Sequence, residues 1–179
     1  TRSSQGAIRL YPCVVGTVDE MTKWEQWLNT FLPSIYDNPK AYSLRDLDDS
    51  EQADIDDIGF VNRTRLNCYA IENLLLTNEC LSEHGYTAEQ FCEKIEQWSN
   101  INPEHQTTES LIALKDIVAN CRTTKKKELR NVILALLGTT KPWEVLVGQL
   151  IVKKLPASDG DDNSLRTYLG EKVIEKLFS

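Results

Sequence analysis

The order of apolar segments in the first third of the chain is the feature that most constrains its fold. Residues 7–15 (AIRLYPCVV), 40–45 and 59–66 have the short apolar or alternating patterns that predict β-strands. Between the first two, residues 18–32 predict a helix with apolar side chains at helical spacing. The expected core face of this helix comprises Met21, Trp24, Leu28 and Phe31. Strand, helix and strand in this order imply a parallel sheet with a right-handed crossover.

The chain after Asn67 predicts helices only. Asn67 is a candidate N-cap for the segment that contains YAIENLLL, and Thr87-Ala-Glu-Gln90 is a capping box that opens a helix running through Trp98. Later helices are expected to begin at Thr107 or Thr108, at Thr124 and at Pro142, and a last helix is expected over 164–178. The predicted fold class is therefore α/β, with a small parallel sheet over 1–80 and a helical subdomain over 81–179 packed on it.

Composition narrows the classes of function. The chain has 179 residues and a net charge of −7, which argues against binding nucleic acid by bulk charge alone. Bound divalent cations would offset that charge locally, so a nuclease is still allowed. The five cysteines form an odd set without a CxxC pair, which predicts reduced thiols in a cytoplasmic protein. We expect no membrane span and no secretory leader.

An acidic stretch follows the second predicted strand, AYSLRDLDDSEQADIDD (41–57), and places Asp46, Asp48 and Asp49 close together. Acid-rich loops are most often simply solvated. A calcium loop counted from Asp46 would need Gly at its sixth position and Glu at its twelfth, where Glu51 and Asp57 stand instead. A second frame, counted from residue 54, places Ile58 and Arg65 where oxygen ligands belong, so the calcium pattern fails in both frames.

A metal site of another kind fits this stretch better. Ligands of open parallel sheets bind outside the carboxyl ends of the strands, where Asp46 and Asp48 are expected. Because they stand two residues apart, an extended chain would point both carboxylates the same way. Glu72 is the candidate third acid, since it lies within an apolar run where burial without a partner is costly. The alternatives for Glu72 are an ion pair with Arg63 or Arg65, or stabilisation by the dipole at the N-terminus of its helix.

These residues together resemble a known family. Asp46-Leu-Asp48 at a strand end, a short strand next, and Ile71-Glu72-Asn73-Leu-Leu resemble the TOPRIM domain of the OLD (overcoming lysogenization defect) nucleases, of the kind paired with ABC-type ATPases in bacterial anti-phage defence. The resemblance covers residues 7–80, and it extends only loosely to the helical remainder. It implies a Mg²⁺- or Mn²⁺-dependent nuclease, with Asp46, Asp48 and Glu72 as metal ligands and catalytic carboxylates.

The resemblance also implies partners: a nucleic-acid substrate and an ABC-type ATPase domain or subunit, with self-assembly left open. Candidate contacts to nucleic acid are Arg45, Arg65, Lys125, Lys126 and Lys127. The alternative for the lysines is plain solvation, and for Arg45 it is an ion pair with a neighbouring aspartate.

The chain departs from the family pattern at two places. The essential Glu after the family's first strand has no counterpart before Ile8, and the Gly-Lys pair of the late helix reads Gly148-Gln149. Three lysines are candidates to replace the missing one: Lys141, Lys153 and Lys154. We therefore expect these 179 residues to be inactive alone. The competing hypothesis is a non-catalytic interaction domain that docks on an ATPase partner.

Overall fold

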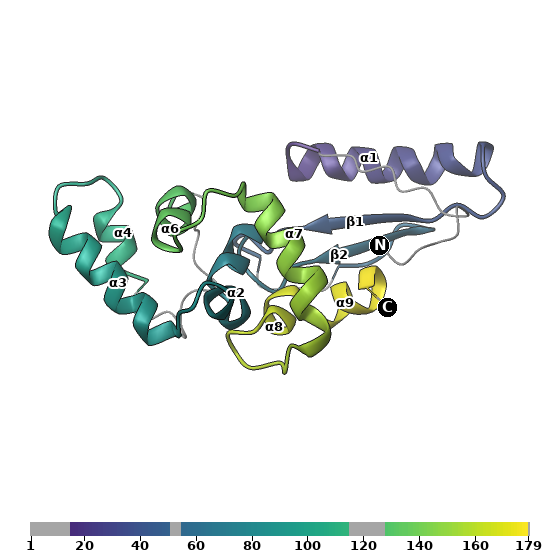
Figure 1. Cartoon of the computed structure of the whole chain (residues 1–179). Coiled ribbons are helices and arrows are strands. Elements are labelled where there is room, and N and C mark those ends of the chain that lie inside the picture. The colour runs from purple at the N-terminus through teal and green to yellow at the C-terminus, as the bar shows by residue number, and fades with distance from the viewer. Residues whose placement is uncertain (1–14, 51–54, 115–127, 179) are drawn as a thin grey trace.

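The computed structural model describes residues 15–50, 55–114 and 128–178, and within them the chain is mixed α/β. The described sheet has two parallel strands, β1 (Ala41–Arg45) and β2 (Val61–Arg65), paired in register from Ala41 opposite Val61 (Figure 1). This confirms the small parallel sheet that the sequence predicted. Residues 7–14 of the other predicted strand lie outside the described part of the chain.

Helices surround this sheet and extend beyond the carboxyl ends of its strands (Figure 1). In chain order they are α1 (Val18–Phe31), the 3₁₀ helices η1 (Leu32–Ser34) and η2 (Ile71–Leu76), α2 (Asn78–Glu83), α3 (Ala88–Ile101), α4 (Thr108–Ile112), α6 (Arg130–Leu136), α7 (Trp143–Lys154), the 3₁₀ helix η3 (Leu155–Ala157), α8 (Leu165–Leu169) and α9 (Glu171–Phe178). α1 lies over one side of the sheet, and α9 contacts β2 from the other side.

Two helices begin with reciprocal hydrogen bonds that the sequence encodes locally. At the start of α1, Thr17 N donates to Glu20 Oε2 at 2.9 Å while Glu20 N donates to Thr17 Oγ1 at 3.2 Å. The predicted box at Thr87 is confirmed, because Thr87 N donates to Gln90 Oε1 at 2.9 Å. α4 has Thr107 at its N-cap position, as one of the two predicted starts, whereas Thr124 lies outside the described residues.

Two predicted helices differ from the observed ones. The segment after β2 becomes helical only at Ile71, because the Asn67 side chain donates to Thr167 O at 2.9 Å instead of capping a helix. The helix expected over 164–178 is divided into α8 and α9 at Gly170, whose φ of +83° favours glycine. A Cβ at Gly170 would also lie 3.2 Å from Asn67 Cβ. The break between α8 and α9 therefore lies directly against Asn67, the residue that contacts the end of α8.

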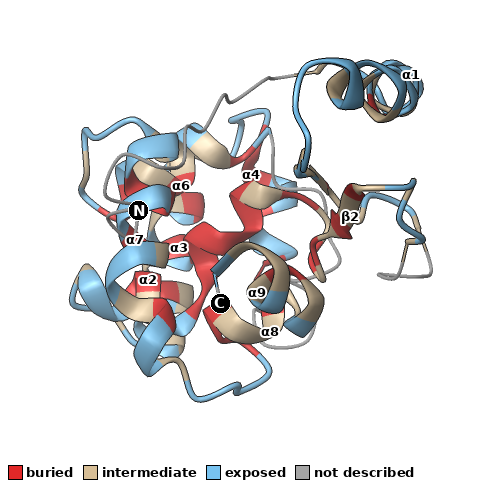
Figure 2. Ribbon diagram, turned by 90° about the vertical axis from the view of Figure 1, so that its right-hand side faces the viewer, coloured by how far each residue is buried: buried red, intermediate tan, exposed pale blue. Residues whose placement is uncertain are grey.

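The core is built around η2. Leu74, Leu75 and Leu76 are fully buried, and η2 contacts α2, α7 and α8. Apolar side chains from β2's end and from the later helices complete one continuous cluster, which includes Phe91 and Tyr168. Figure 2 shows these buried segments through the middle of the helical part, whereas α1 is largely exposed.

α1 rests on the sheet through a buried charge cluster. Glu25 is 2% exposed and contacts Arg45 Nη2 at 2.7 Å and Arg63 Nε at 3.0 Å. Ser43 Oγ donates to the same carboxylate at 2.6 Å, and Thr22 Oγ1 accepts from Arg45 at 3.0 Å. A buried carboxylate is tolerated when it is paired and hydrogen-bonded in this way.

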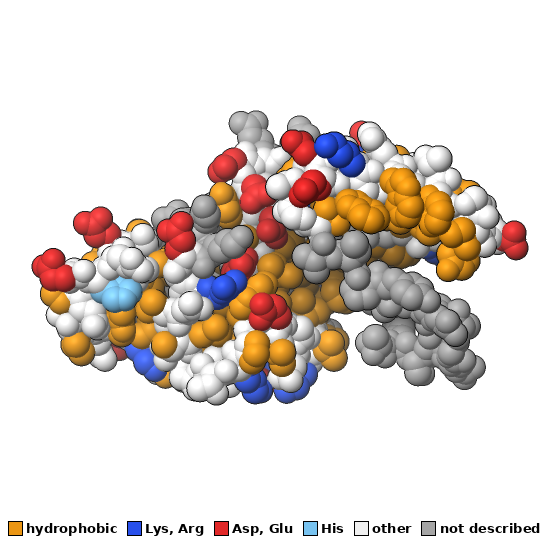
Figure 3. Space-filling model, turned by 90° about the horizontal axis from the view of Figure 1, so that it is seen from above, with side chains coloured by type: hydrophobic (Ala, Val, Ile, Leu, Met, Phe, Trp, Pro, Cys, Tyr) orange, Lys and Arg blue, Asp and Glu red, His pale blue; other side chains and the backbone are white. Residues whose placement is uncertain are grey.

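The aromatic side chains of α1 face outward instead. Trp24, Trp27 and Phe31 are 45%, 47% and 40% exposed, so the prediction that Trp24 and Phe31 face the core is wrong. The Trp24 and Trp27 rings meet edge to face at 5.3 Å, and Trp27 stacks on Phe31 at 4.4 Å. We call these three residues the aromatic ridge; Figure 3 shows apolar side chains along this side of α1.

A bilayer span needs a long apolar helix, and no helix in the described ranges 15–50, 55–114 and 128–178 meets that requirement.

We predict that Glu25→Gln lowers the free energy of unfolding by about 3–5 kcal/mol, because it leaves the buried guanidinium of Arg45 and the partly buried one of Arg63 without their anion. Urea denaturation followed by circular dichroism measures this. The matched control is Glu171→Gln, which removes an exposed ion pair with Arg166 and is expected to cost less than about 1 kcal/mol. Equal losses in the two variants would contradict the structural role of the cluster.

Candidate functional site

The carboxyl end of β1 carries the first candidate ligand. Beyond Arg45, the chain stays paired with the segment after β2, since Leu47 N donates to Cys68 O at 3.2 Å and Asp48 N donates to Tyr69 O at 2.9 Å. This pairing brings the Asp46 carboxylate to the start of η2, where Oδ1 accepts a hydrogen bond from Ile71 N at 3.1 Å. Asp46 is therefore held against the turn that carries Glu72.

Asp48 leaves the extended conformation. Its φ is +48°, in the left-handed region where Asp and Asn are the best tolerated residues after glycine, and its side chain is exposed. Ser50 N donates to Leu47 O at 3.0 Å, which closes a turn around Asp48. The prediction that the Asp46 and Asp48 carboxylates point the same way assumes an extended chain. Because the chain turns at Asp48, this alternation does not fix the direction of the Asp48 carboxylate.

Glu72 is the buried acid of the region. Its side chain is 7% exposed, and Oε1 contacts Arg130 Nη1 at 3.5 Å. This cationic partner comes from α6, whereas Arg63 of β2 contacts Glu25 instead. The Arg130 guanidinium carbon lies 5.3 Å from the centroid of the Trp143 ring, at the start of α7.

The described residues do not include a ready-made cluster of metal ligands. In the ranges 15–50, 55–114 and 128–178, no three His, Cys, Asp or Glu side chains form a group that could hold a metal ion. The structure brings Asp46 and the turn of Glu72 together through the hydrogen bond to Ile71, and leaves Asp48 on the surface. Any cation here would be bound by few carboxylates, together with other oxygen ligands.

The two candidate arginines of the sheet both contact protein groups. Arg45 is buried in the Glu25 cluster on the α1 side of the sheet, and does not pair with Asp48 or Asp49. Arg65 donates from Nη1 to Ser50 Oγ at 2.8 Å, which ties the end of the turn after Asp48 to β2. Lys125, Lys126 and Lys127 lie outside the described residues.

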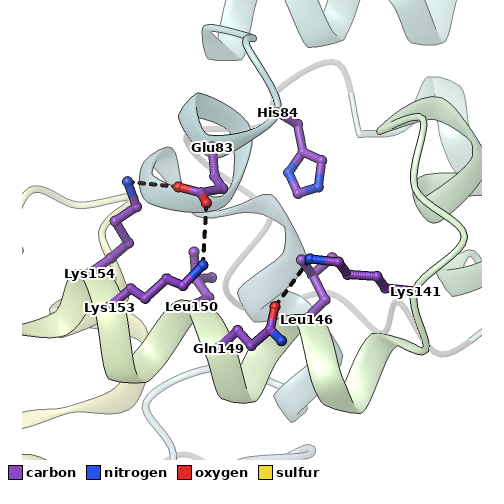
Figure 4. A pocket seen from close by; sticks show the side chains of 8 residues that line it. All are labelled: Glu83, His84, Lys141, Leu146, Gln149, Leu150, Lys153 and Lys154. Atoms are coloured by element: carbon purple, nitrogen blue, oxygen red, sulfur yellow. Dashed lines mark hydrogen bonds and ion pairs between the residues drawn. The ribbon is translucent and has the colours of Figure 1, made fainter.

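A small cavity of about 150 Å³ lies between α2 and α7 (Figure 4). Lys154 Nζ contacts Glu83 Oε2 at 2.8 Å, and Lys153 Nζ lies 3.9 Å from Oε1 of the same carboxylate. The hydrogen bond from Lys154 lowers the pKa of Glu83. On the other side, Lys141 Nζ donates to Gln149 Oε1 at 3.2 Å. Of the three candidate replacement lysines, Lys141 is thus the one that contacts Gln149.

Sequence reasoning missed Arg130 as the partner of Glu72, and Trp143 as the ring that contacts Arg130. The available signal was the requirement that a buried carboxylate has a cationic partner. That requirement does not say which arginine supplies it, and Arg63 and Arg65 were preferred because they are near in sequence. The pairing with Arg130 depends on how α6 and α7 pack against η2.

Comparison of the chain with protein-family models, with curated proteins and with solved structures finds no match in any of the three.

We predict that Asp46→Ala lowers the free energy of unfolding by about 1 kcal/mol in buffer with EDTA, because Ile71 N–H loses a side-chain acceptor at the start of η2. Asp48→Asn is the control, since asparagine tolerates the left-handed conformation, and it is expected to change stability by less than about 0.5 kcal/mol. Chemical denaturation measures both. A larger loss for Asp48→Asn than for Asp46→Ala would refute this assignment.

Proposed function

We propose that this chain carries the carboxylates of a divalent-metal-dependent nuclease site at the junction of β1 and η2. The observation that carries the proposal is the state of Glu72. Among the described residues, the ionic contact of its buried carboxylate is the one with Arg130 Nη1, at the long distance of 3.5 Å. A carboxylate has about four lone-pair sites, so most of its acceptor capacity is left for another ligand.

The donor set suits Mg²⁺ or Mn²⁺. Magnesium is typically bound in proteins through one or two carboxylates, with water and substrate phosphate completing its octahedron. Asp46 and Glu72 would supply the two carboxylates, and Asp48 would contribute from the adjacent turn. This requires no group of three preassembled acidic side chains, so it is compatible with the arrangement of the described residues.

The chemistry proposed is hydrolysis of a phosphodiester bond in DNA or RNA. A divalent cation, when bound, polarises the phosphate and favours deprotonation of the attacking water, so that no nucleophilic side chain is needed. Asp46 and Glu72 would orient the water and accept its proton. The position of these residues beyond the carboxyl ends of parallel strands is where open α/β sheets bind their ligands.

The wider setting of the proposal rests on the sequence resemblance. Asp46-Leu-Asp48 and Ile71-Glu72-Asn73 are the residues that resemble the TOPRIM domain of OLD nucleases. From that resemblance we propose that the chain is the effector part of an ATPase-associated anti-phage defence protein. The parallel strand pair followed by a helical layer is compatible with a TOPRIM-like unit.

We predict that Mn²⁺ raises the melting temperature of the wild type but not that of the Asp46→Ala/Asp48→Ala double variant. At 100 times its dissociation constant, a ligand specific for the folded state adds about 2.7 kcal/mol, which corresponds to a shift of roughly 5–10 °C for a chain of this size. Differential scanning fluorimetry over a Mn²⁺ titration measures the shift.

The matched control for this titration is Asp161→Ala/Asp162→Ala, which removes two exposed aspartates from the loop before α8. It is expected to respond to Mn²⁺ as the wild type does. If all three proteins shift equally, binding to the candidate site is excluded.

We predict that the full-length protein, assayed with its ATPase partner and Mg²⁺, cleaves DNA or RNA, and that Asp46→Ala reduces the cleavage rate by at least about 100-fold. The assay compares labelled DNA and RNA substrates on denaturing gels. The proposal would be refuted by an Asp46→Ala protein that cleaves as fast as the wild type and has an unchanged circular dichroism spectrum.

A second candidate function is favoured by the aromatic ridge of Trp24, Trp27 and Phe31. Large aromatic side chains exposed together on one helix are typical of protein–protein interfaces. In this alternative, the chain is a non-catalytic domain that docks on the ATPase partner through α1. Loss of complex formation in Trp27→Ala, with nuclease activity absent from the wild type, would favour it over the enzyme.

A further inference from the structure

Arg130 occupies a distinctive position beside the candidate site. It is the first residue of α6, and its guanidinium lies between the Glu72 carboxylate, at 3.5 Å, and the ring of Trp143, at 5.3 Å from the centroid. The side chain is 30% exposed, so part of the group reaches the surface. Three segments, η2, α6 and α7, thus meet at one guanidinium.

The guanidinium uses little of its hydrogen-bonding capacity. Arginine has five N–H donors in a planar fork, and strong contacts to carboxylates are about 2.7–2.9 Å long. The contact with Glu72 is longer than that, and Arg130 Nε is buried with no hydrogen-bond partner in the described part of the chain. A buried donor without an acceptor is costly, so the contact with Glu72 leaves the guanidinium incompletely satisfied. The exposed part of the side chain is where a further anion can reach the group.

Trp143 explains how the group is kept in place without many hydrogen bonds. A guanidinium over an indole ring is held by cation–π attraction. This attraction needs no hydrogen-bond acceptor, so it leaves the hydrogen-bonding capacity of the group for a planar or tetrahedral anion. Arginine is well suited to phosphate for this reason, because its fork can donate two parallel hydrogen bonds.

We propose that Arg130 binds a phosphate group of the nucleic-acid chain next to the cation held by Asp46 and Glu72. This inference rests on the proposed nuclease function and adds the residue that positions the phosphodiester. Without the cation, Glu72 is the anion that Arg130 contacts. When a cation takes the Glu72 carboxylate, that contact weakens and the guanidinium is free to pair with phosphate.

The two roles of the region predict opposite effects on two affinities. Replacing Arg130 by Gln removes the phosphate contact and is expected to weaken binding of an oligonucleotide roughly tenfold, the value of one charge-assisted hydrogen bond. The same change removes a cation that competes for Glu72, so the affinity for Mn²⁺ in the absence of nucleic acid should stay equal or rise.

The experiment compares the wild type, Arg130→Gln, Glu72→Gln and the control Arg166→Gln in the full-length protein. Arg166 is a matched arginine because it forms an ion pair with Glu171 at 2.7 Å and is 38% exposed. Titration calorimetry measures Mn²⁺ binding without nucleic acid. Fluorescence anisotropy measures binding of a DNA and an RNA oligonucleotide of the same sequence, with Ca²⁺ in place of Mg²⁺. Circular dichroism checks that each variant is folded.

The proposal is supported if Arg130→Gln loses oligonucleotide affinity, keeps Mn²⁺ affinity and differs in both respects from Glu72→Gln, while Arg166→Gln behaves as wild type. It is overturned if Arg130→Gln binds oligonucleotide as the wild type does, if the wild type binds none, or if Mn²⁺ and oligonucleotide affinities fall together, because Arg130 would then only hold Glu72 in place. If Arg130→Gln does not fold, Arg130→Lys, which keeps the charge but not the fork, carries the same test with a smaller expected loss of about threefold.

Failure of the metal site has a different signature. In that case Glu72→Gln leaves Mn²⁺ binding unchanged. A loss of oligonucleotide affinity in Arg130→Gln would then show a phosphate contact, but the proposal that this phosphate lies next to a cation on Glu72 would be overturned. The two hypotheses are therefore separated by the Mn²⁺ titration of Glu72→Gln.

Discussion

Burial of one short segment organises the helical part of this protein. η2 is a 3₁₀ turn whose side chains from Glu72 to Leu76 are all buried, and α2, α7 and α8 pack around it. A segment enclosed in this way must satisfy its backbone and its one charge internally. The Asp46 carboxylate accepts the Ile71 N–H, and Arg130 meets Glu72. The polar groups of the candidate site are therefore the same groups that allow η2 to be buried.

This double use links the sheet to the helices. Asp46 comes from the end of β1, Glu72 from η2, Arg130 from α6 and Trp143 from α7, so the site is assembled only when four distant segments are packed together. The individual contacts that link these segments are each of modest strength. A ligand that contacts both the carboxylates and the guanidinium would hold the sheet and the helical layer together more tightly. Its charged groups would interact with side chains from all four segments at once.

Local signals in the sequence predicted local structure well. The parallel strands, the Thr87 capping box and the helices near Thr107 and Pro142 follow from patterns of a few residues. What depended on distant partners was not predictable. The helical spacing of Trp24 predicts that it faces the core, but α1 meets the sheet through Glu25. A glutamate between Trp24 and Gln26 gives no indication that two strand arginines will face it. Likewise, the contact between Asn67 and the chain before Gly170 joins positions a hundred residues apart.

The Glu25 cluster also limits how α1 can turn about its own axis. An apolar helix face tolerates a change of angle, because one methyl group replaces another. A carboxylate shared by Arg45 and Arg63 does not, since turning the helix far enough to bury Trp24 and Trp27 would draw Glu25 away from both guanidinium groups and leave two positive charges behind. The ionic contact thus fixes the rotation of α1 about its axis. It keeps the two tryptophan side chains exposed on the outer face of the helix, in a constant orientation relative to the sheet.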